Sequence, residues 1–443
     1  MKENNASSGI TPMRSLWSET ALAGPWLTEL IGPVQSQVVV VGAGYTGLSA
    51  ALHLSEAARD VVVLDSAEIG ERASGLNGGQ VIAGLKEHPD ALESLYGAKG
   101  EAVVSAVGAA PDLVFELIRK HSIECEAVRT GWIQPASTSA ALDAVAERVR
   151  QWTQRGAPVA LLSPEETERL TGSAYYSGAW IDRRGGSVQP LSYVRGLARA
   201  AQHLGARIFS RSSAMKLERV GQRWRIDTPR GSVEGPVIII ATNAYTDRLV
   251  DELRRTIVAL PSLQVATVPL PEALRATILP ERQAVSDTQR LLRYFRLHGT
   301  GRLVMGTRGA FGDTPEAFAA AHHYRAVREI YPQLEGIGFE YHWGGLVAMT
   351  ADGLPHLHEI AAGLLTGLGY NGRGVAMATL MGRLLAQWVL TGSAHELPFP
   401  VVPVKPIPLH RFNGIGARLA IQYLRALDGM TRLRSRRSVP KCA

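Results

Sequence analysis

A glycine-rich turn near the N-terminus has the residue types and spacing that phosphate binding requires. Gly42, Gly44 and Gly47 form a GxGxxG pattern directly after four valines at residues 38–41. The first glycine permits a tight turn, the second lets backbone N–H groups approach a pyrophosphate, and the third lets a helix pack on the strand. The pattern predicts a dinucleotide whose diphosphate lies at a helix N-terminus, in contact with Gly42, Ala43, Gly44, Tyr45, Thr46 and Gly47.

An acidic residue follows the second predicted strand. Residues 61–64 are Val-Val-Val-Leu and Asp65 comes next, about 20 residues after the turn, where a carboxylate accepts hydrogen bonds from ribose hydroxyls. A carboxylate there disfavours a 2′-phosphate, so FAD or NAD fits better than NADP. A lone GxGxxG often marks only a glycine-rich turn. The preceding strand, the amphipathic pattern over 48–58 and the acid together favour dinucleotide binding.

The loop after Asp65 favours a flavin over a nicotinamide cofactor. Small and amide residues over 66–80 replace the continuing βα repeat of an NAD dehydrogenase and suit close contact with a flat ring, although a surface loop is the alternative. A second glycine-rich stretch at 363–374 leads into a predicted helix over 375–390, whose N-terminus could stabilise negative charge on a reduced flavin. The predicted contacts are Ser66, Arg72, Ala73, Ser74, Asn77, Gly78, Gly79, Gln80, Gly369, Gly372, Arg373 and Gly374.

A second group of candidate residues lies on a predicted strand over 291–297. Alternation places Leu292, Tyr294 and Arg296 on one face. On a sheet that faces a flavin, Arg296 could bind a substrate carboxylate and Tyr294 could form one wall of the pocket. A solvent-facing strand arginine is the alternative.

Five ordered segments resemble those of a known superfamily. They are the GxGxxG turn, 73–80, 239–245, 341–355 and 369–374. The chain over about 15–414 resembles the FAD-dependent D-amino-acid oxidase, glycine oxidase and sarcosine oxidase superfamily, and most of all its γ-glutamylputrescine oxidoreductase-like and pipecolate oxidase-like members. The resemblance implies an α/β fold with a Rossmann-type FAD-binding domain and a discontinuous antiparallel-sheet substrate domain. We expect the first from 15–86, 158–246 and 340–400, the second from 87–157 and 247–339, and a C-terminal extension over 401–443.

The resemblance also implies further cofactor contacts. Ala214 and Met215 should touch the adenine, and the strand end at Thr242 and Asn243 should adjoin the cofactor. Gly345 aligns with the position where some relatives carry a cysteine that attaches FAD. We therefore expect non-covalent FAD.

Substrate contacts follow from motif position as well. Tyr370 and Asn371 should flank the flavin, and His342 and Trp343 should line the pocket, although a lone histidine is more often a core residue. Lys86 could sit near the flavin, with a solvated surface lysine as the commoner outcome.

Two positions depart from the pattern. Leu76 stands where subfamily members often have arginine, which could alter how the flavin or substrate is held, and Ala376 stands where sarcosine oxidase-like members carry lysine. The second departure removes a cationic carboxylate contact and makes sarcosine an unfavourable substrate. Arg296 or another residue would have to replace that contact.

The implied reaction is oxidation of a C–N bond in a secondary amine or an N-substituted or cyclic amino acid, such as a γ-glutamyl-amine or pipecolate. Hydride would pass to flavin N5 and leave an imine, and no dedicated acid–base residue is required. Molecular oxygen is the usual acceptor in the superfamily, and other acceptors remain open. The exact substrate, its stereochemistry and the oligomeric state are not fixed by the sequence.

Composition agrees with a globular enzyme. The chain has 443 residues, of which 46% are hydrophobic and 20% charged, and it contains no apolar run long enough to span a bilayer. The N-terminal residues 1–12 are polar and unlike a signal peptide, so a cytoplasmic location is expected. Cys125 and Cys442 are too few for a disulfide framework and lack a metal-ligand spacing.

The C-terminal extension predicts a basic amphipathic helix. Apolar residues recur at helical spacing, namely Ile415, Leu419, Tyr423, Leu427 and Met430. Arginines accompany them against the single acid Asp428 and supply much of the net charge of +7. Such a helix could lie on an anionic membrane and suit an amine dehydrogenase that reduces quinone. A helix packed on its own domain with a basic end is the more ordinary reading. A tRNA-modifying flavoprotein and a non-catalytic flavin carrier are further alternatives; no nucleic-acid partner is expected.

Overall fold

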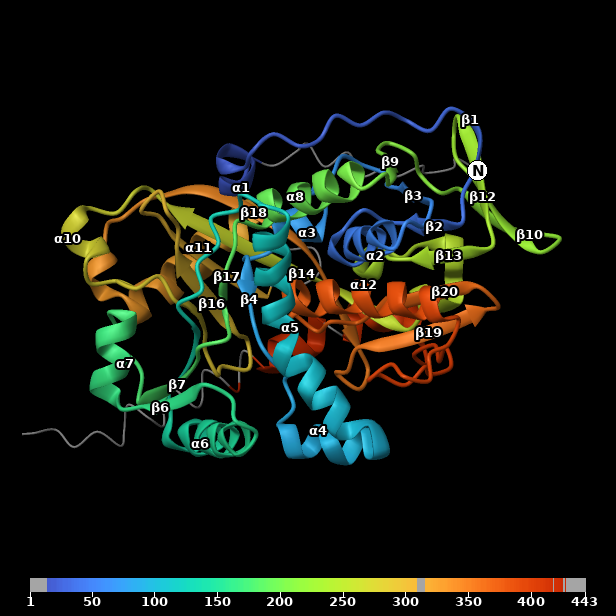
Figure 1. The fold of residues 1–443 in the computed structure, drawn as a ribbon. Coiled ribbons are helices and arrows are strands. Elements are labelled where there is room, and N and C mark those ends of the chain that lie inside the picture. The colour runs from blue at the N-terminus through green and yellow to red at the C-terminus, as the bar shows by residue number, and fades with distance from the viewer. Residues whose placement is uncertain (1–13, 309–314, 417, 425–426, 428–443) are drawn as a thin grey trace, which may run out of the picture.

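The computed structural model describes residues 14–308, 315–416, 418–424 and 427 (Figure 1). The fold is built around two large sheets, of which the first has six strands in the order β19-β20-β13-β2-β3-β9. Its neighbours pair in parallel except for β19, which is antiparallel to β20. The strands are β2 (Val38–Val41), β3 (Val61–Leu64), β9 (Arg207–Phe209), β13 (Val237–Ile240), β19 (His356–Ala361) and β20 (Leu364–Leu368). Near-continuous apolar runs form β2, β3 and β13 because both faces of this sheet are covered.

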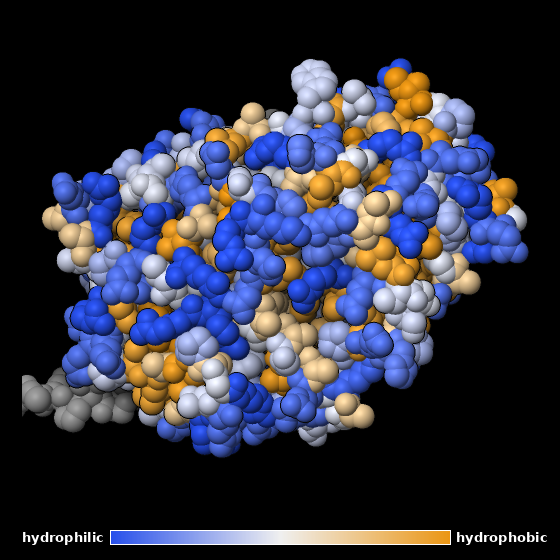
Figure 2. All heavy atoms as spheres, in the orientation of Figure 1, coloured by the Kyte–Doolittle hydropathy of each residue, from blue (hydrophilic) through white to orange (hydrophobic). Residues whose placement is uncertain are grey.

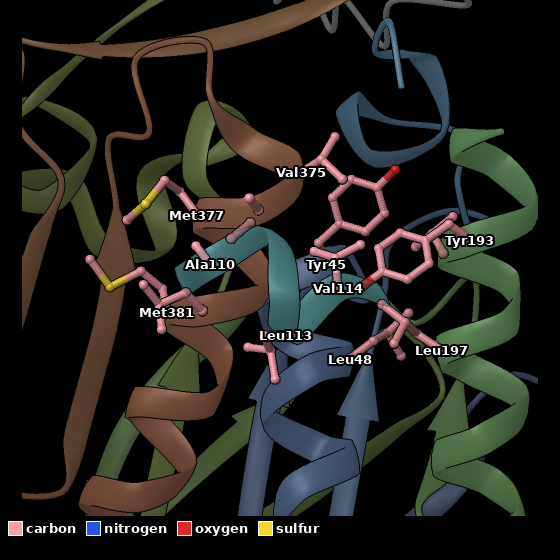
Figure 3. Close-up of a cluster of buried hydrophobic side chains, with 14 of the residues drawn as sticks. Tyr45, Leu48, Ala110, Leu113, Val114, Tyr193, Leu197, Val375, Met377 and Met381 are labelled. Atoms are coloured by element: carbon pink, nitrogen blue, oxygen red, sulfur yellow. The ribbon is translucent and has the colours of Figure 1, made fainter. Parts of the chain in front are cut away.

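Helices cover one face of the six-stranded sheet. These are α2 (Tyr45–Glu56), α5 (Gly100–Lys120), α8 (Pro190–His203) and α12 (Gly374–Thr391). Figure 3 shows Leu48 of α2, Val114 of α5, Leu197 of α8 and Met381 of α12 in one apolar cluster. Among the described helices only α12 is long and apolar enough to cross a membrane, and it is 67% buried inside the protein. Since α12 packs on α2 and α5, it is a core helix.

A four-stranded sheet covers the other face. Its order is β1 (Gly32–Gln35), β12 (Gly231–Gly235), β11 (Arg223–Asp227) and β10 (Lys216–Val220). Val39 and Val62 point toward this sheet and pack with Ile226 and Val233. A tight turn at residues 221–222 connects β10 and β11, which pair antiparallel.

The second large sheet has eight strands. Its order is β18 (Phe339–Thr350), β14 (Ile257–Thr267), β17 (Leu303–Arg308), β16 (Arg293–Leu297), β15 (Ala284–Ser286), β5 (Trp132–Ala136), β7 (Gly178–Asp182) and β6 (Val159–Leu162). All neighbours pair antiparallel except β15 and β5. Val265, Phe295 and Met305 on one face pack against Val327 and Ile330 of α11 (Pro315–Ile330).

The expected domain boundaries need correction where strands join this sheet. β6 and β7 fall within the segment 158–246 and β18 within 340–400, yet all three belong to the eight-stranded sheet. Conversely, α5 lies in the segment 87–157 but packs on α12 beside the six-stranded sheet (Figure 1). The chain crosses between the two sheets more often than the sequence pattern suggested, because short strands carry no mark of the sheet that they join.

The remaining elements are short or peripheral. They are α1 (Leu16–Thr20), α3 (Ala73–Leu76), β4 (Gln80–Val81), α4 (Pro89–Tyr96), α6 (Ser139–Gln154), α7 (Pro164–Thr171), β8 (Gly186–Ser187), α9 (Asp251–Arg254) and α10 (Glu272–Arg275). Capping explains their boundaries: the Thr138 hydroxyl accepts the Ala141 N–H at the start of α6, and Ser163 forms a capping box with Glu166 at α7. On the face in Figure 2, apolar side chains lie in small groups among polar ones.

Candidate functional site

A cavity of about 550 Å³ lies between the six-stranded and eight-stranded sheets. Its lining begins at Val41, at the end of β2, and extends to Ala378 in α12. The eight-stranded sheet contributes Gln134, Ser262 and Tyr294. Both sheets therefore wall one space, and a ligand in it would contact segments from most of the chain.

The glycine-rich turn after β2 occupies one end of the cavity. Gly42 has a φ of +105°, and a Cβ there would lie 2.9 Å from the carbonyl oxygen of Ala241. A Cβ on Gly47 would overlap the carbonyl oxygen of Gly42, so the third glycine gives close packing, as expected. Gly44 lines the cavity beside Ser74, whose hydroxyl accepts the Tyr45 N–H over 3.0 Å. Backbone N–H groups at the start of α2 therefore lie where a diphosphate could approach them.

Asp65 holds this turn in shape. Its Oδ2 accepts the Ala43 N–H over 2.7 Å and its Oδ1 accepts the Ala67 N–H over 2.9 Å. Burial raises the pKa of Asp65, against the lowering effect of these two bonds. Each carboxylate oxygen keeps a further lone pair, and Asp65 lines the cavity. The side chain is therefore placed to accept ribose hydroxyl groups.

The first turn of α12 also borders the cavity. Its N-cap residue Arg373 makes no side-chain cap bond, and a Cβ on Gly374 would meet no atom within 4 Å. The guanidinium of Arg373 instead donates to the Ala83 carbonyl oxygen over 2.7 Å, and burial lowers the pKa of Arg373 to about 9. Open space beside uncapped N–H groups and Gly345 fits the flat ring of a flavin and negative charge at its edge.

Tyr294 forms a wall of the cavity. Its hydroxyl lies 2.8 Å from the Ser262 hydroxyl, and its ring lies across Gly306 of the intervening strand β17. The side chain of Gln264, two residues along β14, donates to the carbonyl oxygen of Leu76 in α3. This contact ties the sheet to the glycine- and amide-rich loop.

Arg296 does not line the cavity, which corrects the prediction that it binds a substrate carboxylate. Its side chain lies on the face of Tyr294 but is 1% exposed. The guanidinium donates to the Val188 carbonyl oxygen over 2.9 Å and lies 4.8 Å from the Trp17 ring centroid. Burial lowers the pKa of Arg296 to about 10. The Arg296 side chain therefore links the eight-stranded sheet to the segment just before α8.

His342 and Trp343 also lie outside the cavity lining, so the expected pocket contacts are corrected. Trp343 is 1% exposed and donates from Nε1 to the Leu76 carbonyl oxygen over 3.1 Å. Alternation places His342 on the opposite face, where its ring centroid is 6.4 Å from that of Phe339. Both belong to the packing around β18.

Tyr370 and Asn371 line the cavity, but their polar groups bind the protein. The Tyr370 hydroxyl lies 2.6 Å from the Thr46 hydroxyl in α2. Asn371 has a φ of +51°, its Oδ1 accepts the Thr350 N–H, and its Nδ2 donates to the Gly369 carbonyl oxygen. Both residues lie near the first turn of α12, as their motif position predicted. Their polar groups form hydrogen bonds with other residues of the protein and not with the cavity space.

Most of the predicted cofactor residues line the cavity. The four that do not are Gly47, Gly79, Met215 and Gly369, of which Met215 is 67% exposed. The lining set is Gly42, Ala43, Gly44, Tyr45, Thr46, Asp65, Ser66, Arg72, Ala73, Ser74, Asn77, Gly78, Gln80, Ala214, Thr242, Asn243, Gly345, Gly372, Arg373 and Gly374. Met215 lies just before β10, and its backbone N–H donates to the carbonyl oxygen of Asp227 over 2.8 Å.

Sequence reasoning missed several lining residues from the eight-stranded sheet and nearby helices. Ser262, Gln264, Arg308 and Arg148 were not singled out. Lys86, for which both a place near the flavin and a surface position were considered, keeps solvent-accessible surface at the cavity wall, where the surrounding protein still partly desolvates its ammonium group. Alternation along 303–308 fixes only which residues share a face with Arg308, and the register that pairs it with Ser262 places that face at the cavity. No local signal marks Arg148, which reaches the cavity from the middle of α6.

The described residues that line the cavity include neither cysteine nor histidine. Cys125 is buried elsewhere, and burial raises the pKa of its thiol to about 12. Cys442 lies outside the described residues.

The parallel sheet, its glycine turn and Asp65 directly after β3 are the features of a Rossmann-type dinucleotide-binding protein. The sequence profile of the "FAD dependent oxidoreductase" family matches residues 37–388, so the chain belongs to that family. The cofactor is FAD, and the cavity residues fit it. The protein is an FAD-dependent oxidoreductase of the amine and amino-acid class.

Relatives agree in fold and class. The chain is 31% identical over 393 residues to γ-glutamylputrescine oxidoreductase of Escherichia coli K12, covering 87% of this chain and 92% of the relative. It is 24% identical over 364 residues to glycine oxidase of Bacillus licheniformis, covering 80% and 92%. The crystal structure of glycine oxidase from Geobacillus kaustophilus superimposes with a TM-score of 0.71 at 21% identity, covering 83% of this chain and 99% of that one.

Proposed function

We propose that the protein oxidises a C–N bond in a secondary amine or an N-substituted or cyclic amino acid, with γ-glutamyl-amines as the first candidates and pipecolate-like rings as the second. The observation that carries this proposal is the continuity of one cavity from the dinucleotide turn to the polar wall of Ser262, Tyr294 and Arg308. The similarity to γ-glutamylputrescine oxidoreductase supports the choice of first candidate.

FAD supplies the hydride acceptor for this chemistry when it is bound. The protein orients the substrate: the Tyr294 and Ser262 hydroxyls offer hydrogen bonds to its polar groups, and Leu292 and Val347 give apolar contact. The N–H groups at the start of α12 stabilise negative charge that develops near them. Lys86 at the cavity wall has its pKa lowered to about 7 by burial and by the neighbouring Arg308 and Arg373, so it can hold or release a proton there.

We propose molecular oxygen as the acceptor and the cytoplasm as the compartment. The partners are then a small-molecule amine or amino acid and oxygen, without nucleic acid.

The test is anaerobic bleaching of the flavin absorption band at about 450 nm, which is lost when a flavin is reduced. The panel comprises γ-glutamyl-amines, pipecolate, proline, sarcosine and simple polyamines. We expect a γ-glutamyl-amine or a cyclic imino acid to bleach the flavin, and readmitted air to restore the colour with formation of peroxide. Failure of every amine to bleach a flavin that dithionite reduces would refute the proposed reaction. Bleaching without recovery in air would refute the oxygen assignment and leave a dehydrogenase.

The exposed face of the C-terminal helix favours a second candidate, an amine dehydrogenase that contacts a membrane and reduces quinone. Residues 413–416 and 418–424 are helical. Ile421 packs on Leu291, which is next in sequence to the cavity-lining residue Leu292. Ile415, Leu419 and Tyr423 of the predicted apolar stripe are instead 62%, 67% and 65% exposed. Met430 and the later arginines lie outside the described residues. Binding to anionic vesicles together with quinone reduction that exceeds oxygen reduction would select this candidate.

A further inference from the structure

A row of side chains crosses the cavity face of the eight-stranded sheet. Tyr294 of β16 pairs with Ser286 of β15. In the parallel pair of β15 and β5, Val285 is opposite Ile133, so the next residues, Ser286 and Gln134, lie side by side. Tyr294, Ser286 and Gln134 all line the cavity. The cavity therefore extends along the sheet for two strand spacings, about 10 Å, from Tyr294 to Gln134.

The same row leads to the flavin end in the other direction. Tyr294 pairs with Gly306 of β17, which pairs with Gln264 of β14. The Gln264 side chain donates to the carbonyl oxygen of Leu76, in the loop that was predicted to contact the flavin. None of the predicted cofactor residues lies on β16, β15 or β5. The space at Gln134, here called the distal end of the cavity, is therefore open to a substrate.

The side-chain amide of Gln134 has a fixed orientation. Its Oε1 accepts the Nε1–H of Trp180, the paired residue on β7, over 3.1 Å. An indole can only donate, and Trp180 is 1% exposed, so the amide oxygen must face it. The Nε2 group of Gln134 makes no hydrogen bond to any residue that the structure describes. Gln134 therefore offers N–H donors to a ligand in the cavity.

Thr288 places a hydroxyl next to this amide. Its backbone N–H donates over 3.2 Å to the carbonyl oxygen of Pro135, which follows Gln134 in β5. The Thr288 side chain lines the cavity, and among the described residues its hydroxyl has no hydrogen-bond partner. A hydroxyl can donate and accept. Gln134 and Thr288, both half-buried, thus present a donor and an acceptor without any charge.

Ser286, in the middle of the row, makes no such offer. Its hydroxyl donates to Oε1 of Gln80 over 2.7 Å and accepts the Nε1–H of Trp132 over 3.2 Å. The single donor of this hydroxyl is therefore already used. The apolar side chain of Ile82 and the ring of Trp132 line the cavity as well. A ligand that spans the row should be apolar in its middle and polar at the distal end.

We infer that Gln134 and Thr288 form a distal subsite that binds an amide group of the substrate, separated by an apolar chain from the C–N bond that is oxidised. The Nε2–H of Gln134 donates to the amide carbonyl oxygen, and the Thr288 hydroxyl accepts the amide N–H. Both polar groups of the amide are then paired, which matters because burial of an unpaired amide is costly. Binding at the distal end also helps to orient the C–N bond near Tyr294.

The inference rests on the proposed function and narrows its substrate class. Amines that carry an amide at the end of an apolar chain, as γ-glutamyl-amines do, can use the distal subsite. Pipecolate-like rings have no such group and cannot reach both Tyr294 and Gln134 across about 10 Å. The subsite therefore favours the first candidate substrates over the second.

A carboxylate is the rival occupant, because the cations Lys86 and Arg148 also line the cavity. Gln134 and Thr288 are neutral, and the guanidinium of Arg148 already donates to the carbonyl oxygen of Lys86. The amide is thus the better match to the distal end. A probe that carries an amide and no carboxylate separates the two occupants.

The test measures anaerobic flavin reduction in the holoenzyme by three amines. They are γ-glutamyl-diaminobutane, N-acetyl-diaminobutane, which keeps the amide without a carboxylate, and heptylamine, which has neither. Each titration gives a dissociation constant and a limiting rate. The variants are Gln134→Met and Thr288→Val, together with Gln134→Glu, which keeps an acceptor for Trp180. Gln222→Met is the control because that residue is exposed in the turn between β10 and β11, outside the cavity lining.

We expect the dissociation constants of both amide-bearing amines to rise at least about threefold in all three variants, the loss of one neutral hydrogen bond. The limiting rates should stay the same, and heptylamine should be unaffected by Gln134→Met and Thr288→Val. The control should match wild type with every amine. An altered limiting rate with all three amines would instead indicate a structural role and overturn the subsite.

Two further outcomes also decide against the subsite. One is unchanged affinity for N-acetyl-diaminobutane in Gln134→Met and Thr288→Val. The other is a loss confined to γ-glutamyl-diaminobutane, which would show a carboxylate contact. If no amine reduces the flavin, calorimetry of N-acetyl-diaminobutane with the oxidised holoenzyme replaces the reduction measurement. Affinity that depends on Gln134 and Thr288 there would refute the proposed reaction while the amide subsite stands.

Discussion

The ring of Tyr294 occupies the space above Gly306 where any side chain would have stood. A Cβ on Gly306 would overlap the Cζ, Cε2 and hydroxyl atoms of Tyr294. Because β17 leaves that space empty, the tyrosine spans the strand and reaches Ser262 of β14. Burial raises the pKa of Tyr294 to about 12, against a lowering by Ser262 and Arg308, so the phenol stays protonated and acts as a hydrogen-bond donor.

Gly306→Ala should displace Tyr294 from the cavity wall. Overpacking of this kind costs about 1–3 kcal/mol, and loss of the correct wall should lower kcat/KM by about tenfold or more. Steady-state kinetics with the substrate that bleaches the flavin, together with FAD content, measure the effect. Tyr294→Phe is the matched variant: it keeps the ring and removes the hydroxyl. A normal kcat/KM in Gly306→Ala would show that Tyr294 does not contact the substrate.

Binding of benzoate, a small carboxylate, in the cavity should depend on pH through the lining residue Lys86. Burial, Arg308 and Arg373 lower its pKa to about 7, and Glu87 opposes them. Below that pKa the ammonium is charged, so benzoate affinity should rise as the pH falls from about 8.5 to 6 while Arg308 stays protonated throughout. Titrations at several pH values with wild type and Lys86→Met check this. The same pH dependence in Lys86→Met would assign it to another group.

Asp65→Ala should weaken FAD binding. The substitution removes two backbone hydrogen bonds that shape the turn and the acceptor for ribose hydroxyls. At about 1.5–3 kcal/mol for a hydrogen bond to a charged group, the dissociation constant for FAD should rise at least about tenfold. Reconstitution of apoprotein with FAD, followed by flavin fluorescence, measures it. Asp60→Ala is the control because that residue is half exposed and lies outside the cavity lining. An unchanged FAD affinity would contradict the assigned role.

Asp287→Ala should destabilise the protein rather than only reduce activity. The Arg293 and Asp287 side chains are 2% and 0% exposed and lie 2.6 Å apart. Removal of one partner leaves a buried charge and costs about 3–5 kcal/mol, moderated here by the second contact of Arg293 with Glu329. Denaturant unfolding should show the loss, whereas Asp251→Ala, whose carboxylate is 48% exposed, should change stability by less than about 1 kcal/mol. Equal stability of both variants would contradict a structural role for the pair.

The residues predicted for the cofactor end depend on local sequence pattern, and most of them line one cavity. The turn at Gly42, Gly44 and Gly47 and the acid Asp65 each need particular residue types at fixed spacing, and the structure places them together. The family assignment is confirmed by the match over 37–388.

The substrate end was predicted less well because strand register decides it. Alternation correctly put Tyr294 and Arg296 on one face of the strand. Tyr294 lines the cavity, whereas Arg296, two residues further along, is buried and donates to the Val188 carbonyl oxygen. Arg308 reaches the cavity only through its pairing with Ser262, a contact between residues far apart in the sequence. The expected domain boundaries were wrong at β6, β7 and β18 for the same reason.

The cavity draws its walls from two sheets that the chain builds by repeated crossings. A cofactor that fills this cavity binds the folded protein and has no comparable site on the unfolded chain, so it stabilises the folded state. By mass action, free FAD at about a thousand times its dissociation constant adds about 4 kcal/mol to the free energy of unfolding. Binding of FAD is thus coupled to the folding of both sheets. In the apoprotein the cavity should open, so that Gly42 and Tyr294 no longer line one space, before either sheet unfolds.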